Sequence, residues 1–180
     1  MLVVMLLGTP GVGKSTVGRA LASKLGIRLV ELTELAGGDE EVDPRALSAR
    51  SGALLRRLGG GVVCSHVVFK PRSLEVRRAV VLRRDPLELV GVLRSRGYEE
   101  RKVRENVEVE LIGLVYWEAV RRFGERTVAQ LDVTGRSVDE VVDLALQVVK
   151  GEYSGERVDW LSSMEESRLE ELLRYLSSSA

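Results

Sequence analysis

The sequence predicts an α/β fold built on parallel strands. Three observations lead to this class. Five short apolar segments have the character of strands, several segments between them repeat apolar residues at helical spacing, and a glycine-rich loop joins the first strand to the first helix. Strands that alternate with helices are joined by crossover connections, which makes neighbouring strands parallel.

The first strand candidate is Leu2–Leu7, an apolar and partly β-branched segment of the length expected for a strand buried on both faces. The loop over residues 8–16 follows it directly and reads GTPGVGKST. It fits the phosphate-binding pattern of a glycine, four variable residues, glycine, lysine and a serine or threonine. Apolar residues then recur at helical spacing as far as Gly26, which is well placed to end a helix. Strand, glycine loop and helix are the context that this motif requires.

The residue types of this loop match its chemistry. Gly11 and Gly13 can take backbone angles that a Cβ would forbid, so the loop can turn its N–H groups around a phosphate chain. Lys14 supplies a mobile positive charge for the β- and γ-phosphates, and Ser15 supplies a hydroxyl for the magnesium ion that bridges them. The sequence therefore predicts a magnesium-assisted phosphate site in this loop.

The other elements follow in order. Arg28–Leu32 is the second strand candidate, and the chain is then polar and glycine-bearing as far as Asp43. Asp43 and Pro44 are suited to the N-cap and first turn of a helix that Gly59 would end. Further strands are expected at 61–66, 79–82 and 128–132, and further helices at 86–93, about 100–123 and 137–150.

The C-terminal part has a different character. Residues 1–150 are expected to form the domain, and residues 151–180 a linker followed by a helix. In that helix Leu169, Leu172, Leu173 and Leu176 form an apolar stripe. The stripe could dock on a partner, but packing against the chain's own core is the favoured interpretation.

Composition restricts the class of protein further. The chain has 180 residues with 44% hydrophobic content, which suits one soluble domain. With 27 basic and 27 acidic residues the formal net charge is zero, which argues against direct nucleic acid binding. The apolar run at 1–7 is too short to span a membrane, and a single cysteine, Cys64, excludes an internal disulfide. These features favour a cytoplasmic protein, and the scarcity of asparagine and glutamine is typical of heat-adapted chains.

Several separate stretches resemble one family of nucleoside monophosphate kinases. The chain is similar to the archaeal members of the group that contains eukaryotic adenylate kinase isoenzyme six, an enzyme also implicated in small ribosomal subunit maturation. The stretches occur in the family's order and cover most of residues 1–161: the loop at 8–16, the strand that ends at His66, residues 81–86, Arg96-Gly97-Tyr98 with Lys102, Glu105-Asn106 and Glu110, residues 131–136, and Asp159-Trp160-Leu161.

The resemblance implies a five-stranded parallel sheet with helices on both faces, an NMP-binding insertion at about 33–58 and a lid at about 94–104. The implied reaction is transfer of the γ-phosphoryl of ATP to AMP, with Mg²⁺ as the metal and ADP as the product. A lid of this composition can close over a triphosphate and neutralise its charge. Its basic residues are Arg94, Arg96, Arg101, Lys102 and Arg104.

The resemblance also implies roles for single residues. Lys14 and Arg96 would stabilise the transferring phosphoryl group, Ser15 would hold magnesium, and Thr16 would hold the α- and β-phosphates together with the amides of the loop, including those of Gly11 and Gly13. Arg136 matches the family position that packs near the adenine. The candidates for AMP are Thr33, Arg45 and Arg50.

The chain departs from the family at two positions. The third strand of the family ends with a carboxylate, one variable residue and histidine, whereas this chain has Cys64-Ser65-His66. A neutral thiol cannot replace a carboxylate for magnesium. Either Ser15 and the phosphates hold the metal alone, or Asp85 or another acid approaches it, or turnover is weak. Val92 stands where the family has an arginine, and Arg94 is two residues from that position.

Two other functions compete with the adenylate kinase reaction. The resemblance also supports an ATP-dependent assembly factor of the small ribosomal subunit, with a ribosomal protein as partner and weak or no kinase turnover. A kinase for another small acceptor is the third reading, because this fold changes substrates readily. ATP and AMP are the expected partners of the first function, and dependence on AMP distinguishes it from the other two.

Overall fold

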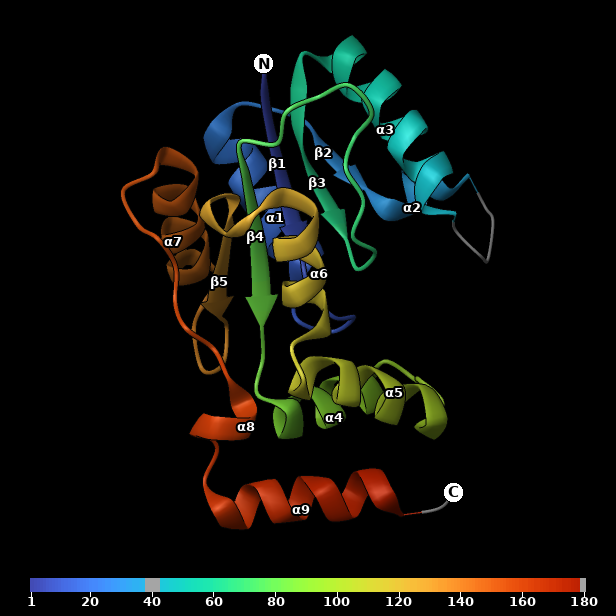
Figure 1. Cartoon of the computed structure of the whole chain (residues 1–180), viewed down its shortest axis with the longest axis vertical. Helices are drawn as coiled ribbons and strands as arrows, with labels where there is room; N and C mark the ends of the chain where they lie inside the picture. The colour runs from blue at the N-terminus through green and yellow to red at the C-terminus, as the bar shows by residue number, and fades with distance from the viewer. Residues whose placement is uncertain (38–42, 179–180) are drawn as a thin grey trace.

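The computed structural model describes residues 1–37 and 43–178, whose strands and helices alternate along the chain (Figure 1). The strands are β1 (Leu2–Leu7), β2 (Leu29–Glu31), β3 (Gly60–Ser65), β4 (Arg78–Arg83) and β5 (Val128–Asp132). The helices are α1 (Lys14–Leu25), α2 (Leu32–Ala36), α3 (Pro44–Leu58), α4 (Pro86–Ser95), α5 (Glu100–Leu111), α6 (Leu114–Phe123), α7 (Val138–Lys150), α8 (Trp160–Ser163) and α9 (Glu166–Ser177), with a short 3₁₀ turn η1 at Glu125–Thr127.

The five strands form one sheet in the order β2-β3-β1-β4-β5, and each pair of neighbours is parallel. The predicted five-stranded parallel sheet is therefore confirmed. β1 lies at the centre of the sheet, so the loop that follows it emerges between the carboxyl ends of other strands. Open α/β sheets bind their ligands at this edge. In Figure 1 the arrowhead of β4 points toward α4 and α5, which lie beyond the same edge.

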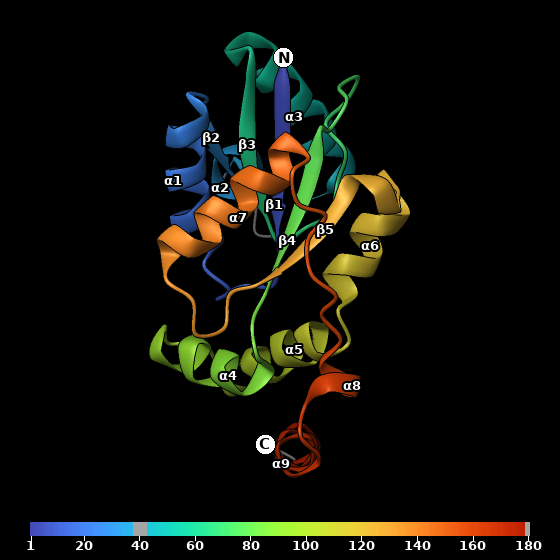
Figure 2. The ribbon, with the colours of Figure 1, turned by 90° about the vertical axis from the view of Figure 1, so that its left-hand side faces the viewer.

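Alternation along β1 divides the core into two layers. Val4 and Leu6 belong to the apolar cluster that includes residues of α1 and α7, whereas Val3, Met5 and Leu7 belong to the cluster that includes residues of α3 and α6. All five side chains are at most 1% exposed, because successive residues of a strand point to opposite faces and both faces are covered. Figure 2 shows α1 and α7 on one side of the sheet and α6 on the other.

Several helix ends are where the sequence predicts them. Gly26 ends α1 with a left-handed backbone at φ 65°. Asp43 caps α3 by accepting a hydrogen bond from the backbone N–H of Arg45, and Pro44 occupies the first position of the helix. Ser137 and Glu140 form the expected capping box at the start of α7. These signals are local in sequence, which explains why they can be recognised without the fold.

The helix predicted over 100–123 is wrong in one respect: it is two helices, α5 and α6, separated at Ile112 and Gly113. Gly113 has a left-handed backbone at φ 66°. A Cβ at this glycine would lie 3.1 Å from a guanidinium nitrogen of the buried Arg83. The apolar spacing continues across the break, so periodicity alone predicts one helix. The short helix α2 also lies in a segment that the sequence indicates only as polar.

The C-terminal residues pack against the chain itself. α9 lies alongside α4 and α5 at the carboxyl edge of the sheet (Figures 1 and 2), with Leu172 fully buried and Leu169 packed against the same core. The Tyr175 ring stacks with the guanidinium groups of Arg94 and Arg104, at 5.2 and 5.5 Å from its centroid. Packing on the chain's own core is therefore confirmed. Within residues 1–37 and 43–178, no helix has the length and apolar character needed to cross a membrane.

Candidate active site

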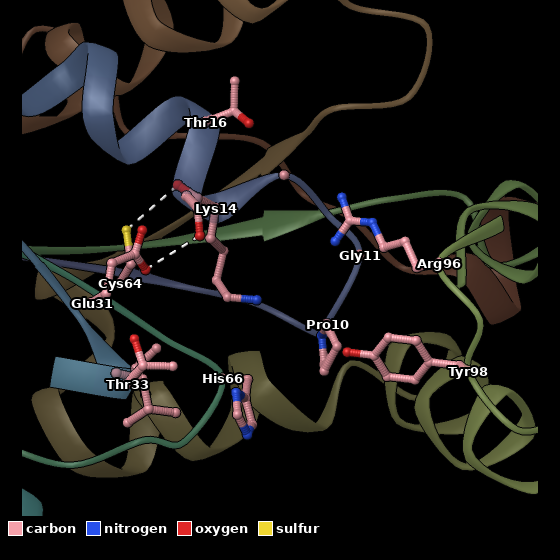
Figure 3. A pocket seen from close by; sticks show the side chains of 14 residues that line it. Pro10, Gly11, Lys14, Thr16, Glu31, Thr33, Cys64, His66, Arg96 and Tyr98 are labelled. Carbon is pink, nitrogen blue, oxygen red and sulfur yellow. Dashed lines mark hydrogen bonds between the residues drawn. The ribbon is translucent and has the colours of Figure 1, made fainter. Parts of the chain in front are cut away.

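A cavity of about 330 Å³ opens at the carboxyl edge of the sheet, beside the loop after β1. It is lined from three sides: the loop and the start of α1, the carboxyl ends of β2 and β3, and the connection between α4 and α5 (Figure 3). The lining side chains used below are those of Lys14, Ser15, Thr16, Glu31, Thr33, Cys64, His66, Arg96 and Tyr98. Gly11 and Gly13, which the sequence assigns to phosphate binding, line it as well.

The loop takes its shape from its glycines. Gly11 and Gly13 have φ angles of 93° and 98°, in the region that L-residues with a Cβ rarely adopt. A Cβ on Gly11 would also lie 2.8 Å from a methyl carbon of Leu89 in α4. Gly13 is the N-cap of α1, so the first free N–H groups of this 12-residue helix lie beside the cavity. Such a helix start favours bound phosphate.

Lys14 is the central cation of the cavity (Figure 3). Its Nζ donates a hydrogen bond to the carbonyl oxygen of Thr9 at 2.9 Å. Burial, with a smaller contribution from the positive charge of Arg96, lowers the pKa of Lys14 to about 8, although Cys64, Glu110 and Glu31 act in the opposite direction. Because both lysine and arginine face this space, the cavity is suited to a polyanion such as a phosphate chain.

Ser15 and Glu31 place two kinds of oxygen ligand side by side. The Ser15 hydroxyl donates to Oε2 of Glu31 at 3.2 Å, and both residues line the cavity with Lys14. Hydroxyl and carboxylate oxygens are ligands that suit magnesium, which usually completes its shell with water and nucleotide phosphates. In the described part of the chain no group of three or more His, Cys, Asp or Glu residues could hold a metal ion. The Ser15 hydroxyl and the Glu31 carboxylate fit a magnesium ion that arrives with a nucleotide.

Arg96 and Tyr98 approach the loop from the α4–α5 connection, on the side of the cavity opposite Glu31 and Cys64 (Figure 3). The expected Arg96 is thus brought next to the expected Lys14. Both side chains are exposed in the connection, at the end of α4 and around Gly97, whose φ is 76°. Thr16 and Thr33, to which the resemblance assigns nucleotide contacts, also line the cavity.

Cys64 and His66 lie at the end of β3. The Cys64 side chain is 2% exposed, and its Sγ donates to the carbonyl oxygen of Lys14 at 3.4 Å. Burial raises the pKa of this thiol to about 12, with Glu31 adding to the rise, so it stays neutral. His66 reaches solvent, yet partial desolvation and the charge of Lys14 lower its pKa. A neutral imidazole therefore faces the cavity near pH 7.

Four other residues singled out by the sequence lie elsewhere. Arg136 donates to the backbone oxygen of Asp132 and pairs with Glu156 at 2.6 Å. Arg50 donates to the carbonyl oxygens of Leu35 and Ala36 at the end of α2.

Arg45 lies in a separate cavity with Lys70, Arg72 and Arg122. Arg94 pairs with Glu100 at 2.7 Å on the side that faces α9, so it does not replace the arginine missing at Val92. None of these four arginines lines the cavity around Lys14.

A buried polar network supports the loop from behind, and sequence reasoning assigned it no role. Glu110 is 1% exposed and accepts hydrogen bonds from the Thr9 hydroxyl at 2.6 Å, from Nε of Arg83 at 2.7 Å and from the Trp160 indole at 3.1 Å. Four segments far apart in sequence therefore meet at one carboxylate. All four belong to stretches on which the family resemblance rests, and this is the signal that could have indicated a shared function.

Glu31 is the second residue that sequence reasoning missed. It is the last residue of β2 and pairs in register with Cys64 of β3. A carboxylate at the carboxyl end of a parallel strand, next to the strand that lacks the expected acid, is a recognisable signal only when the strand order is known. The observed order β2-β3-β1 places Glu31 next to the end of β3.

Comparisons with known proteins agree with this geometry. A family model described as "AAA domain" matches residues 4–113. Relatives named "Putative adenylate kinase" include one from Pyrobaculum aerophilum, 35% identical over 97% of this chain and 94% of the relative, and one from Pyrococcus furiosus, 34% identical over 92% and 94%. A gluconokinase structure from Sinorhizobium meliloti has a similar fold, with a TM-score of 0.58, 20% identity and 98% coverage of both chains. The chain therefore belongs to the archaeal adenylate kinase-like family of P-loop kinases.

Proposed function

We propose that the protein is an adenylate kinase that transfers the γ-phosphoryl group of ATP to AMP and releases two molecules of ADP. The observation that carries the proposal is the convergence of Lys14 and Arg96 on one cavity beside the start of α1. Two relatives whose names carry this activity align with the chain over 94% of their own length, which supports the choice of reaction.

The reaction places few chemical demands on the protein. In-line phosphoryl transfer needs no covalent intermediate, so catalysis depends on alignment and on stabilising the charge of the transferring group. Lys14 and Arg96 are the cations for that charge, and Thr16 with the amides of the loop would hold the α- and β-phosphates. Ser15 would hold magnesium, which neutralises phosphate charge when it is bound. Thr33, on the β2 side of the cavity, is the AMP candidate that lines it.

The segment at 94–104 is suited to the role of a lid. It joins the end of α4 to the start of α5 and carries Arg96 and Tyr98 into the cavity wall. We assign the NMP-binding role to about residues 33–58, whose described parts comprise most of α2 and the whole of α3. Residues 38–42 of this range lie outside the described residues. Closure of such segments over bound nucleotides excludes water from the transferring phosphoryl group.

Formation of ADP tests the proposal. ATP and magnesium are supplied with and without AMP to the wild type, to Lys14→Ala and to Lys24→Ala. Lys24 lies on the same helix, is exposed and pairs with Asp143 at 2.6 Å, so its loss serves as the matched control. We expect AMP-dependent ADP formation by the wild type and by Lys24→Ala, and a loss of 100-fold or more, as a rough expectation, in Lys14→Ala. Wild-type ADP formation that is unchanged by AMP would contradict the adenylate kinase.

An assembly factor that uses ATP as a switch is the second candidate function. Its support is an exposed apolar group around a cavity of about 590 Å³ between α6 and α8, formed by Ile112, Trp117 and Leu161. Exposed apolar groups of this kind are typical of protein-binding surfaces. Slow ATP hydrolysis that AMP does not change, with retained ATP binding, would favour this function, and the partner to test would be a small-subunit ribosomal protein.

A further inference from the structure

We propose that Glu31, at the end of β2, supplies the carboxylate that the magnesium of the bound nucleotide requires, in place of residue 64 at the end of β3. The proposal rests on the proposed function, because it assumes that ATP binds in the cavity beside Lys14. It places this residue on the strand next to the one where the family pattern has its acid.

Residue 64 cannot perform this role. Its side chain is a buried thiol, and sulfur is a poor ligand for a hard cation. The side chain is also turned toward α1. Its Sγ donates to the Lys14 carbonyl at 3.4 Å, and a Cβ on Gly18 of the same helix would lie 2.3 Å from the sulfur. Cys64 therefore packs the strand against the helix.

Glu31 lies one strand away from Cys64 at the same level of the sheet. The two residues are register partners in a parallel pair, so their side chains leave the sheet on the same face. Figure 3 shows Glu31 next to Cys64 and turned toward the start of α1. Its Oε2 accepts from the Ser15 hydroxyl at 3.2 Å, and Ser15 is the residue that the loop motif assigns to the metal. The carboxylate on the strand next to Cys64 therefore lies beside the residue that the motif assigns to the metal.

Other acids near the loop are engaged elsewhere. Asp85 caps α4 by accepting from the N–H groups of Leu87 and Glu88, and it pairs with Arg168 at 2.9 Å. Glu110 is enclosed in the buried network with Thr9 and Arg83. Glu31, in contrast, makes one hydrogen bond and no ion pair within residues 1–37 and 43–178. Its carboxylate therefore has lone pairs left for the water molecules of a nucleotide-bound magnesium.

The charge of Glu31 predicts opposite effects in two binding conditions. Without magnesium the carboxylate repels the phosphates of ATP, so replacing it should leave ATP affinity unchanged or raise it. With magnesium the carboxylate holds the metal's water molecules, so the same replacement should weaken binding. Removal of such outer-shell partners costs roughly 10–100-fold in metal affinity. A residue that only maintained the shape of the cavity would weaken binding in both conditions.

The experiment is calorimetric titration of ATP into the wild type, Glu31→Gln and Glu34→Gln, once with excess magnesium and once with EDTA. Glu34 is the matched control, because it lies three residues away, pairs at 3.6 Å with Arg28 and does not line the cavity. Binding of Mn²⁺ in the presence of a non-hydrolysable ATP analogue, followed by electron paramagnetic resonance, reports the metal directly and does not depend on turnover.

We expect Glu31→Gln to lose about tenfold or more in affinity for magnesium–ATP and for Mn²⁺, while its affinity for metal-free ATP stays equal or rises. Glu34→Gln should match the wild type in both conditions. Unchanged magnesium–ATP affinity in Glu31→Gln, or equal losses in both conditions, would overturn the proposal. Failure of the wild type itself to bind ATP would instead overturn the proposed function, so the two failures are distinguishable.

Discussion

At the scale of single residues, Lys14 determines how the cavity responds to pH. Burial holds its pKa at about 8, below the ordinary lysine value of 10.5. The protonated amine attracts phosphate and the neutral amine does not. Lys14 is therefore charged at neutral pH, when it can bind nucleotide. It loses its proton at pH values where an ordinary lysine keeps its positive charge.

The affinity for ATP should follow this titration. Below pH 8 we expect a constant dissociation constant, since Lys14 is already protonated in the free protein. Above pH 8 the dissociation constant should rise by up to about tenfold per pH unit, because binding must then also return a proton to the amine. Titration of ATP by calorimetry between pH 6.5 and 10 measures this change.

Lys14→Arg provides the control for this pH dependence. An arginine keeps its charge throughout the range, so its weaker binding should be flat with pH. A wild-type dissociation constant that is also flat up to pH 10 would show that the pKa of Lys14 is not lowered in the folded protein.

At the scale of elements, the break between α5 and α6 places Glu110 against the loop. Gly113 turns the chain with φ 66° and ψ 31°, directly beside the Arg83 guanidinium. Arg83 donates to both the side chain and the backbone oxygen of Glu110, which in turn accepts from Thr9. A continuous helix would carry the chain past Arg83 instead of around it. The turn is therefore part of the support of the phosphate-binding loop.

Gly113→Ala tests how closely residue 113 approaches the Arg83 guanidinium. We expect it to lower the free energy of unfolding by about 1–2 kcal/mol for the left-handed backbone alone, with a further loss because the new methyl group meets Arg83. Gly26→Ala is the matched control, since Gly26 has φ 65° and ψ 28° but open space where a Cβ would stand. Denaturant titration should show the larger loss at Gly113. Equal losses would mean that Arg83 moves aside without cost.

The break and the role of Glu31 mark what the sequence could not predict. Local signals such as the loop glycines, the Asp43–Pro44 start and the Ser137 capping box are contained in a few neighbouring residues, and the structure has them where expected. Glu110 and Thr9 are 101 residues apart, and Glu31 meets Cys64 only through the register of β2 and β3. Such contacts depend on strand order and packing, which periodicity does not contain.

At the scale of the whole molecule, contacts join the C-terminal segment to the phosphate-binding domain. The chain after α7 forms a bridge to β5 at Gln130 and Glu156, and Trp160 reaches the buried Glu110. α9 then covers α4 and α5, with Arg168 paired to Asp85. The boundary near residue 150 stays a prediction from the sequence, and these contacts connect the residues on both sides of it.

Substitutions of two neighbouring leucines of α9 test whether α9 unfolds together with the rest of the chain. Leu172 is fully buried in the cluster that includes residues of α1, α4, α5 and α7, whereas Leu173 is 48% exposed. Leu172→Ala should lower the free energy of unfolding by about 2–5 kcal/mol, because it leaves a cavity in the core, and Leu173→Ala by under about 1 kcal/mol. If the chain folds as one unit that includes α9, tryptophan fluorescence and far-ultraviolet circular dichroism will change together in a single transition. A separate early transition in Leu172→Ala, with the main midpoint unchanged, would instead show that α9 is an independent appendage.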